Sequence, residues 1–202
     1  ENAETALHVD LSSKSLASLP KDIRQLHALE TLSLRNNTLT KLPSTVGSFK
    51  QLKYLYADQN GLSDISPDIG KLKNLRILSL QNNKLAALPD TIGHLSQLEN
   101  LIVMNNRLSV LPDTIGLLKN LQYLSVDNNK LEKLPESINK LARLKVLTVS
   151  NNRILEWPPG KSVPIGLREL HWNRNGLSKF PKAILRMRGL VIITLSENAL
   201  TE

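Results

Sequence analysis

The sequence predicts a right-handed solenoid of the α/β class, with a parallel sheet on its concave side and short helices or 3-10 segments on its convex side. Three observations support this. A Leu recurs every 23 residues, an Asn follows each of these Leu by eight places, and apolar residues alternate with variable ones between them. Self-similarity of this length is typical of stacked units that share one continuous core. The recurring leucines are Leu29, Leu52, Leu75, Leu98, Leu121, Leu144, Leu167 and Leu190.

The alternation after each recurring Leu predicts a short strand with one buried face. Leu78, Ser79 and Leu80 show this period of two. Stacked parallel strands lie roughly 4.8 Å apart, so nine of them would line a surface on the order of 40 Å long. The recurring Asn suits a tight turn, where its side chain can satisfy backbone groups of its own coil and of the next. This column holds Asn37, Asn60, Asn83, Asn106, Asn129, Asn152, Asn175 and Asn198.

The second half of each repeat carries helix-start signals. A Pro such as Pro112 suits the first turn of a short helix, and Asp113 follows it where a helix N-terminus favours negative charge. A Gly such as Gly93 comes just after the buried Ile, and we expect it to let neighbouring coils pack closely.

One repeat, from residue 144 to 166, departs from the pattern. Lys161 and Pro164 stand where the other repeats have an Ile and a Leu. This departure predicts an irregular convex loop with Trp157 packed inward.

Two adjacent repeats show the common frame: "LRILSLQNNKLAALPDTIGHLSQ" and "LENLIVMNNRLSVLPDTIGLLKN" both fit LxxLxLxxNxLxxLPxxIxxLxx. The chain resembles the leucine-rich repeat family, in the 23-residue Leu-Pro-x-x-Ile variety found in Ras-pathway scaffold proteins, Roco-type GTPases and bacterial effectors. The resemblance runs from about residue 6 to the end, with a degenerate first repeat in which Lys14 replaces the Asn. Among the proteins it resembles, such repeats precede a ubiquitin-ligase domain in some effectors and a GTPase in Roco proteins.

We expect residues 1–202 to form one domain of about eight repeats plus a partial last one. A solenoid needs polar units to shield its ends, and none is visible in the sequence, so we expect a fragment of a longer protein. Cys is absent, which favours a reducing, cytoplasmic setting, or a host cytoplasm if the protein is an effector. No apolar stretch approaches the roughly 18 residues of a membrane span, and the N-terminus has no signal-peptide pattern.

Function is expected at the variable strand positions, because the frame residues are occupied by folding. The outward positions gather all three tyrosines with Ile, Met and Val, and polar residues surround them. An apolar centre with a polar edge is typical of a protein-binding surface. The alternative is that exposed Val, Ile and Tyr are only good strand formers. The candidate contact residues are Tyr54, Tyr56, Asp58, Ile77, Gln81, Ile102, Met104, Tyr123, Asp127, Val146 and His171.

The formal net charge of +8 raises the question of an anionic partner. One basic column follows the Asn ladder and would form a stripe along one edge: Lys84, Arg107, Lys130 and Arg153. This basic edge could contact phosphate or an acidic partner with strongly salt-dependent affinity, or it could simply keep a Leu-rich protein soluble. No aromatic residues interleave with it, so we do not expect nucleic acid as a partner.

Catalytic constellations are missing from the sequence. His8 and Asp10 share a strand face, but two ligands do not make a metal site. His171 and Glu169 lie near Thr positions, yet an open sheet offers no oxyanion hole. We therefore expect no catalysis, cofactor or metal, and predict a monomeric module that binds a protein on its concave face. The alternatives are the substrate-recognition part of a larger enzyme, and self-association.

Overall fold

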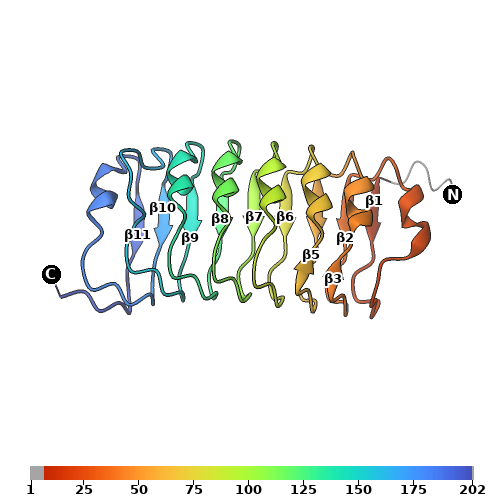
Figure 1. The fold of residues 1–202 in the computed structure, drawn as a ribbon, viewed down its shortest axis with the longest axis horizontal. Coiled ribbons are helices and arrows are strands. Elements are labelled where there is room, and N and C mark those ends of the chain that lie inside the picture. Colours follow the sequence, from red (N-terminus) through yellow and green to blue (C-terminus); the bar gives the residue numbers. More distant parts are fainter. Residues whose placement is uncertain (1–6, 202) are drawn as a thin grey trace.

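The computed structural model describes residues 7–201 and shows the coils side by side in one row (Figure 1). Residues 1–6 and 202, the ends of the expected domain, lie outside the described residues. Nine strands pair in chain order in one parallel sheet, which confirms the predicted architecture, and β3 (Lys41–Leu42) pairs with β5 (Asp64–Ile65) in a second, small sheet. The nine are β1 (His8–Asp10), β2 (Thr31–Ser33), β4 (Tyr54–Tyr56), β6 (Ile77–Ser79), β7 (Asn100–Ile102), β8 (Tyr123–Ser125), β9 (Val146–Thr148), β10 (Glu169–His171) and β11 (Ile192–Thr194).

Adjacent strands pair with a register of one whole coil. Leu55 of β4 lies beside Leu78 of β6, and Leu78 lies beside Leu101 of β7. These leucines are fully buried and belong to one continuous apolar core along the row of coils. Because every coil contributes the same positions, residues of one column stack over one another along the solenoid.

The opposite face carries short 3-10 segments in front of the sheet (Figure 1). They are η2 (Lys21–Gln25), η3 (Ser44–Ser48), η4 (Pro67–Lys71), η5 (Asp90–His94), η6 (Asp113–Leu117), η7 (Glu136–Lys140) and η8 (Lys182–Arg186). Except at η4, the Pro does not open the segment: Pro89 precedes η5 with an extended ψ of 146°, and its carbonyl accepts from Ile92 N at 2.9 Å. The predicted start was therefore one residue early.

The Asn ladder joins each coil to the one before it. Asn83 Nδ2 donates to the carbonyls of Ala57 and Leu80, both at 2.9 Å, and its Oδ1 accepts from Leu62 N at 3.0 Å. The residue before each ladder Asn adopts a left-handed conformation, as Asn82 does with a φ of 57°. Asn tolerates this conformation better than most residues, which accounts for the paired Asn in five repeats.

The irregular repeat has the predicted form. The structure assigns no 3-10 segment to residues 155–166, and Trp157 is buried. The Trp157 ring stands edge-on to Trp172, with the centroids 6.1 Å apart. Asn139 holds the loop: its Oδ1 accepts from Trp157 Nε1 at 2.8 Å, and its Nδ2 donates to Pro159 O at 3.0 Å.

Gly93→Ala should lower the free energy of unfolding by about 1 to 3 kcal/mol, the usual cost of overpacking. A Cβ at Gly93 would lie 2.5 Å from Thr114 O and 2.7 Å from Thr114 Cβ on the next coil. Gly61→Ala is the matched control, because the nearest atom to its Cβ would be Leu39 O at 3.4 Å. Urea unfolding monitored by circular dichroism compares the two variants. Equal losses at both positions would show that close coil approach is not what requires Gly93.

Candidate functional site

The coil register brings the outward side chains of the strands into lateral rows. One row runs through the first residues of β4, β6, β7, β8 and β9 and is apolar there except at Asn100: Tyr54, Ile77, Asn100, Tyr123 and Val146. The next row runs through Tyr56, Ser79, Ile102, Ser125, Thr148 and His171. The structure thus brings the predicted aromatic and aliphatic residues together on one side of the sheet. From Tyr54 to Val146 the first row covers four strand steps, roughly 19 Å.

Exposure separates these residues into contact candidates and structural ones. Of the eleven predicted contact residues, ten are partly exposed, and Asp58 is buried. Ser79 and Ser125 on either side of Ile102 are buried as well. The accessible part of the surface is therefore the apolar row with Tyr56, Ile102 and Met104, and we name it the sheet-face patch.

The prediction that Asp58 belongs to the exposed polar edge of the binding surface is wrong. Asp58 is only 3% exposed, and its Oδ2 accepts a hydrogen bond from Arg35 Nε at 2.8 Å. On the other side, its Oδ1 accepts from Ser79 Oγ and from Gln81 N. Asp58 therefore ties three successive coils together. The Arg35 guanidinium also lies 4.1 Å from the centroid of the Tyr56 ring, which fixes one edge of the sheet-face patch.

Asp127 occupies the same place three repeats later and bonds to the following coil in the same way, while Met104 stands where Arg35 pairs with Asp58. Its carboxylate accepts from Thr148 Oγ1 and from Ser150 N, both on the next coil. The sequence carried a signal for both carboxylates, since each Asp is followed 21 residues later by a hydroxyl residue, Ser79 or Thr148. The two bridges stiffen the sheet on either side of Ile102 and Met104.

Polar groups lie on the sheet beyond each end of the sheet-face patch, on β1 and on β10. At one end, Asp10 accepts hydrogen bonds from the Ser12 hydroxyl and backbone N–H, which lower the pKa of its carboxyl. At the other end, His171 Nδ1 lies 3.1 Å from Thr194 Oγ1, and its Nε2 lies 3.6 Å from Glu169 Oε2. In the part of the chain that the structure describes, no group of three His, Asp or Glu residues could hold a metal ion.

In the turns that follow β10 and β11, Arg174 Nη2 donates to Glu197 Oε1 at 2.6 Å. This bond lowers the pKa of the Glu197 carboxyl and raises the pKa of Arg174.

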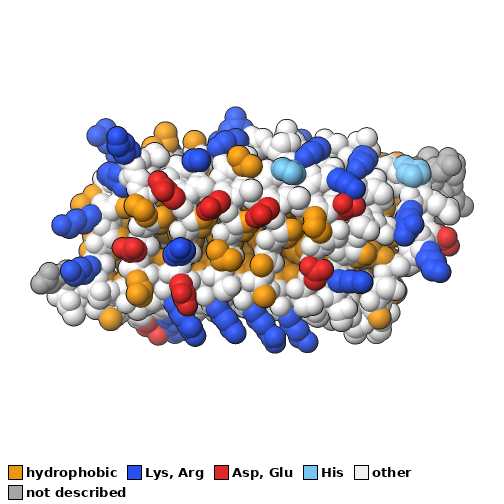
Figure 2. Space-filling model, viewed as in Figure 1, with side chains coloured by type: hydrophobic (Ala, Val, Ile, Leu, Met, Phe, Trp, Pro, Cys, Tyr) orange, Lys and Arg blue, Asp and Glu red, His pale blue; other side chains and the backbone are white. Residues whose placement is uncertain are grey.

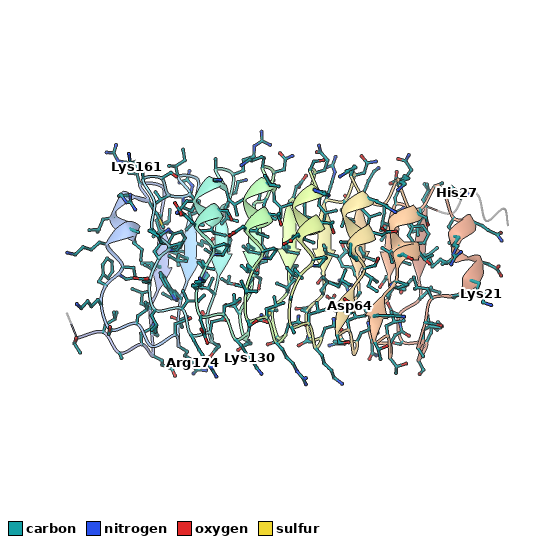
Figure 3. All side chains as sticks on the ribbon, viewed as in Figure 1. Lys21, His27, Asp64, Lys130, Lys161 and Arg174 are labelled. Carbon is teal, nitrogen blue, oxygen red and sulfur yellow. The ribbon has the colours of Figure 1, made fainter. Side chains whose placement is uncertain are left out.

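The basic edge is exposed along one border of the molecule. Figure 2 shows Lys and Arg side chains projecting in a row at the lower edge, where Figure 3 labels Lys130. The backbone N–H of Lys130 donates to Leu108 O at 2.9 Å, so the column is held by coil stacking while its side chains extend into solvent. Within residues 7–201, none of the four basic-edge side chains forms an ion pair. A role for this edge in binding stays a prediction.

Comparison with known families decides what the stacked coils are. The family described as "Leucine-rich repeat region" matches residues 63–156, and the one described as "Leucine Rich Repeat" matches residues 28–49. The chain is a leucine-rich repeat protein. A leucine-rich repeat protein of Leptospira interrogans has a similar structure, with 28% identity, a TM-score of 0.64, and coverage of 100% of this chain and 69% of that one. The crystal structure of PEPR1-AtPEP1 is also similar, with 29% identity, a TM-score of 0.72, and coverage of 89% and 30%.

Curated relatives match a shorter part of this leucine-rich repeat chain. Toll-like receptor 6 of Mus musculus is 40% identical over 55 residues, which are 27% of this chain and 7% of the receptor. Adenylate cyclase of Schizosaccharomyces pombe is 39% identical over 57 residues, which are 28% of this chain and 3% of the cyclase. The chain thus corresponds to a small part of these proteins. Repeats of this family are typical of protein–protein interaction, and no helix in the described residues is long and apolar enough to cross a membrane.

Proposed function

We propose that this leucine-rich repeat chain is a non-catalytic binding module whose concave sheet face contacts a partner protein. The observation that carries the proposal is the sheet-face patch, in which Tyr54, Ile77 and Tyr123 lie in one partly exposed row. Aromatic residues and Met are enriched where proteins meet, and large aromatic side chains dominate binding energy. Support also comes from the likeness to PEPR1-AtPEP1, a complex of a similar repeat structure.

The mechanism is rigid presentation. Asp58 and Asp127 tie neighbouring coils together on either side of Ile102 and Met104, and Arg35 lies over the ring of Tyr56. A surface that is ordered before association loses little conformational entropy when it binds, so modest apolar burial is sufficient for useful affinity. We further infer that the chain acts as a monomer and, because Cys is absent, in a reducing compartment such as the cytoplasm.

A second candidate function is substrate recognition within a larger enzyme. The likeness to part of adenylate cyclase of Schizosaccharomyces pombe favours it, since the matched segment there belongs to a protein that is named for an enzyme activity. The sheet face would then select a substrate or regulate a catalytic domain of the kind found in effector ubiquitin ligases or Roco-type GTPases. Sequencing the gene on both sides of this segment separates the two functions, because only the second requires a catalytic domain.

Tyr54→Ala, Tyr56→Ala and Tyr123→Ala combined should reduce capture of the partner from cell extract at least tenfold, because three partly exposed aromatic rings are removed from one surface. Quantitative mass spectrometry of the captured proteins measures the change. The matched control combines Leu117→Ala, Ile165→Ala and Leu185→Ala, three apolar side chains outside the sheet that are 52%, 70% and 74% exposed. If the tyrosine variant stays folded and retains every partner, the sheet face is not the binding surface.

A further inference from the structure

The convex side carries an apolar groove beside the irregular repeat. It has a volume of about 560 Å³ and runs between the 3-10 segments and the proline-rich loop. Leu111, Leu134 and the neighbouring prolines form its floor, and Val110, 47% exposed, lies at its opening. In Figure 2 a band of hydrophobic side chains runs along this face below a row of acidic ones.

The rim of the groove is acidic although the chain as a whole is strongly basic. Asp90, Asp113 and Glu136 begin the successive segments η5, η6 and η7, and Glu156 lies on the loop across the groove. Lys133 is the cation that lines the same groove. None of these four carboxylates forms an ion pair with any residue from 7 to 201. The groove is therefore complementary to a cationic ligand with an apolar part.

A smaller cavity of about 370 Å³ adjoins the groove and shares Asp113 and Glu136 with it, and Lys140 and Lys161 also line this cavity. The larger groove, with four carboxylates and one Lys among its lining residues, is therefore the part that favours a cation.

The irregular repeat creates this cavity. Ile115 and Ile138 fill the corresponding place in the two preceding coils and are fully buried, whereas Lys161 in this coil is exposed. The loop is held in position by the bonds from Asn139 to Trp157 and Pro159. The opening is thus a fixed feature of the fold.

We propose that the convex groove holds an extended segment of a partner protein that carries Lys or Arg next to an apolar side chain. The apolar side chain lies on Leu111 and Leu134, and the basic groups pair with Asp113 and Glu136. Extended segments have free backbone donors and acceptors at regular spacing, which a groove of this kind can use. This site is separate from the sheet-face patch and does not depend on it.

The test selects peptides from a phage-displayed library of random 12-residue sequences on the immobilised chain. The enriched peptides should be cationic and contain apolar residues. Fluorescence polarisation of the synthetic peptides should show affinity at least tenfold weaker for Asp113→Asn with Glu136→Gln, and weaker binding at high salt. Affinity should be unchanged for the Tyr54, Tyr56 and Tyr123 alanine variant.

The proposal is overturned if no peptide is enriched, if the enriched peptides lack positive charge, or if the Asp113 and Glu136 variant binds them normally. A dimer in light scattering that dissociates on Asp113→Asn with Glu136→Gln would also overturn it, by assigning the groove to a second copy.

Discussion

Asn106→Ala is expected to lower the free energy of unfolding by about 3 kcal/mol or more. Asn106 Nδ2 donates to the carbonyls of Leu80 and Val103, both at 3.0 Å, and its Oδ1 accepts from Leu85 N at 3.0 Å. Ala removes all three bonds and leaves Leu85 N without a partner, whereas Leu80 O and Val103 O each keep one bond, from Asn83 Nδ2 and Asn129 Nδ2. A buried group left unsatisfied costs about 1 to 3 kcal/mol, and each of the other two lost bonds costs about 0.5 to 1.5 kcal/mol.

Asn100→Ala is the control for this prediction, because Asn100 lies partly exposed on the sheet face. A surface change of this kind is expected to alter stability by less than about 0.5 kcal/mol. Urea unfolding gives both values, and hydrogen exchange at the Leu85 amide shows whether the loss is local. Similar losses for the two variants, or an unchanged Leu85 amide, would mean that the ladder does not join the coils.

Trp172→Ala is expected to cost about 3 to 5 kcal/mol, the range for truncating a buried Trp. Trp172 is fully buried, its ring packs edge-on against Trp157, and its Nε1 donates to Ile154 O at 3.0 Å. Trp172 occupies a column that holds smaller residues such as Val126 and Val149 in preceding coils. The two rings together fill the space beside the irregular loop, so the loss should exceed that of truncating an ordinary core residue.

Trp172→Val tests whether the loss of stability comes from breaking the pair of Trp rings. Val fills this column in both preceding coils, as Val149 and Val126, so a column that only requires an apolar side chain would accept it with little loss. If the two rings fill the irregular repeat, Trp172→Val should still cost about 2 kcal/mol because a cavity remains. Wild-type stability in Trp172→Val, measured by urea unfolding, would contradict this account of the loop.

The solenoid could be predicted because its determinants recur within each repeat. A Leu every 23 residues sets the coil length, and alternation with a period of two shows which strand residues point outward. The start of the 3-10 segments was misplaced by one residue because Pro suits both the first helical position and the position before it. Trp157 could be placed correctly because it stands in a column of buried leucines.

The details of the candidate sites depend on contacts between residues of different repeats. Whether Asp58 is exposed is decided by Arg35 one coil earlier and Ser79 on the coil after it, and only the strand register shows how they meet. The convex groove likewise forms between 3-10 segments of three coils and a loop without a repeating pattern. Repeat-by-repeat reasoning gives the direction of a side chain but not its bonds to the neighbouring coils.

Photo-crosslinking tests most directly whether the sheet face is the binding surface. p-Benzoylphenylalanine is placed at position 123 on the sheet or at position 117 on the convex side, where the native Leu117 is 52% exposed. After irradiation in cell extract, partner proteins joined to each variant are identified by mass spectrometry. We expect a specific partner that is joined through position 123 and is not joined through position 117, where only ligands of the convex groove should appear. The absence of any specific partner at position 123 would contradict the proposed role of the sheet face.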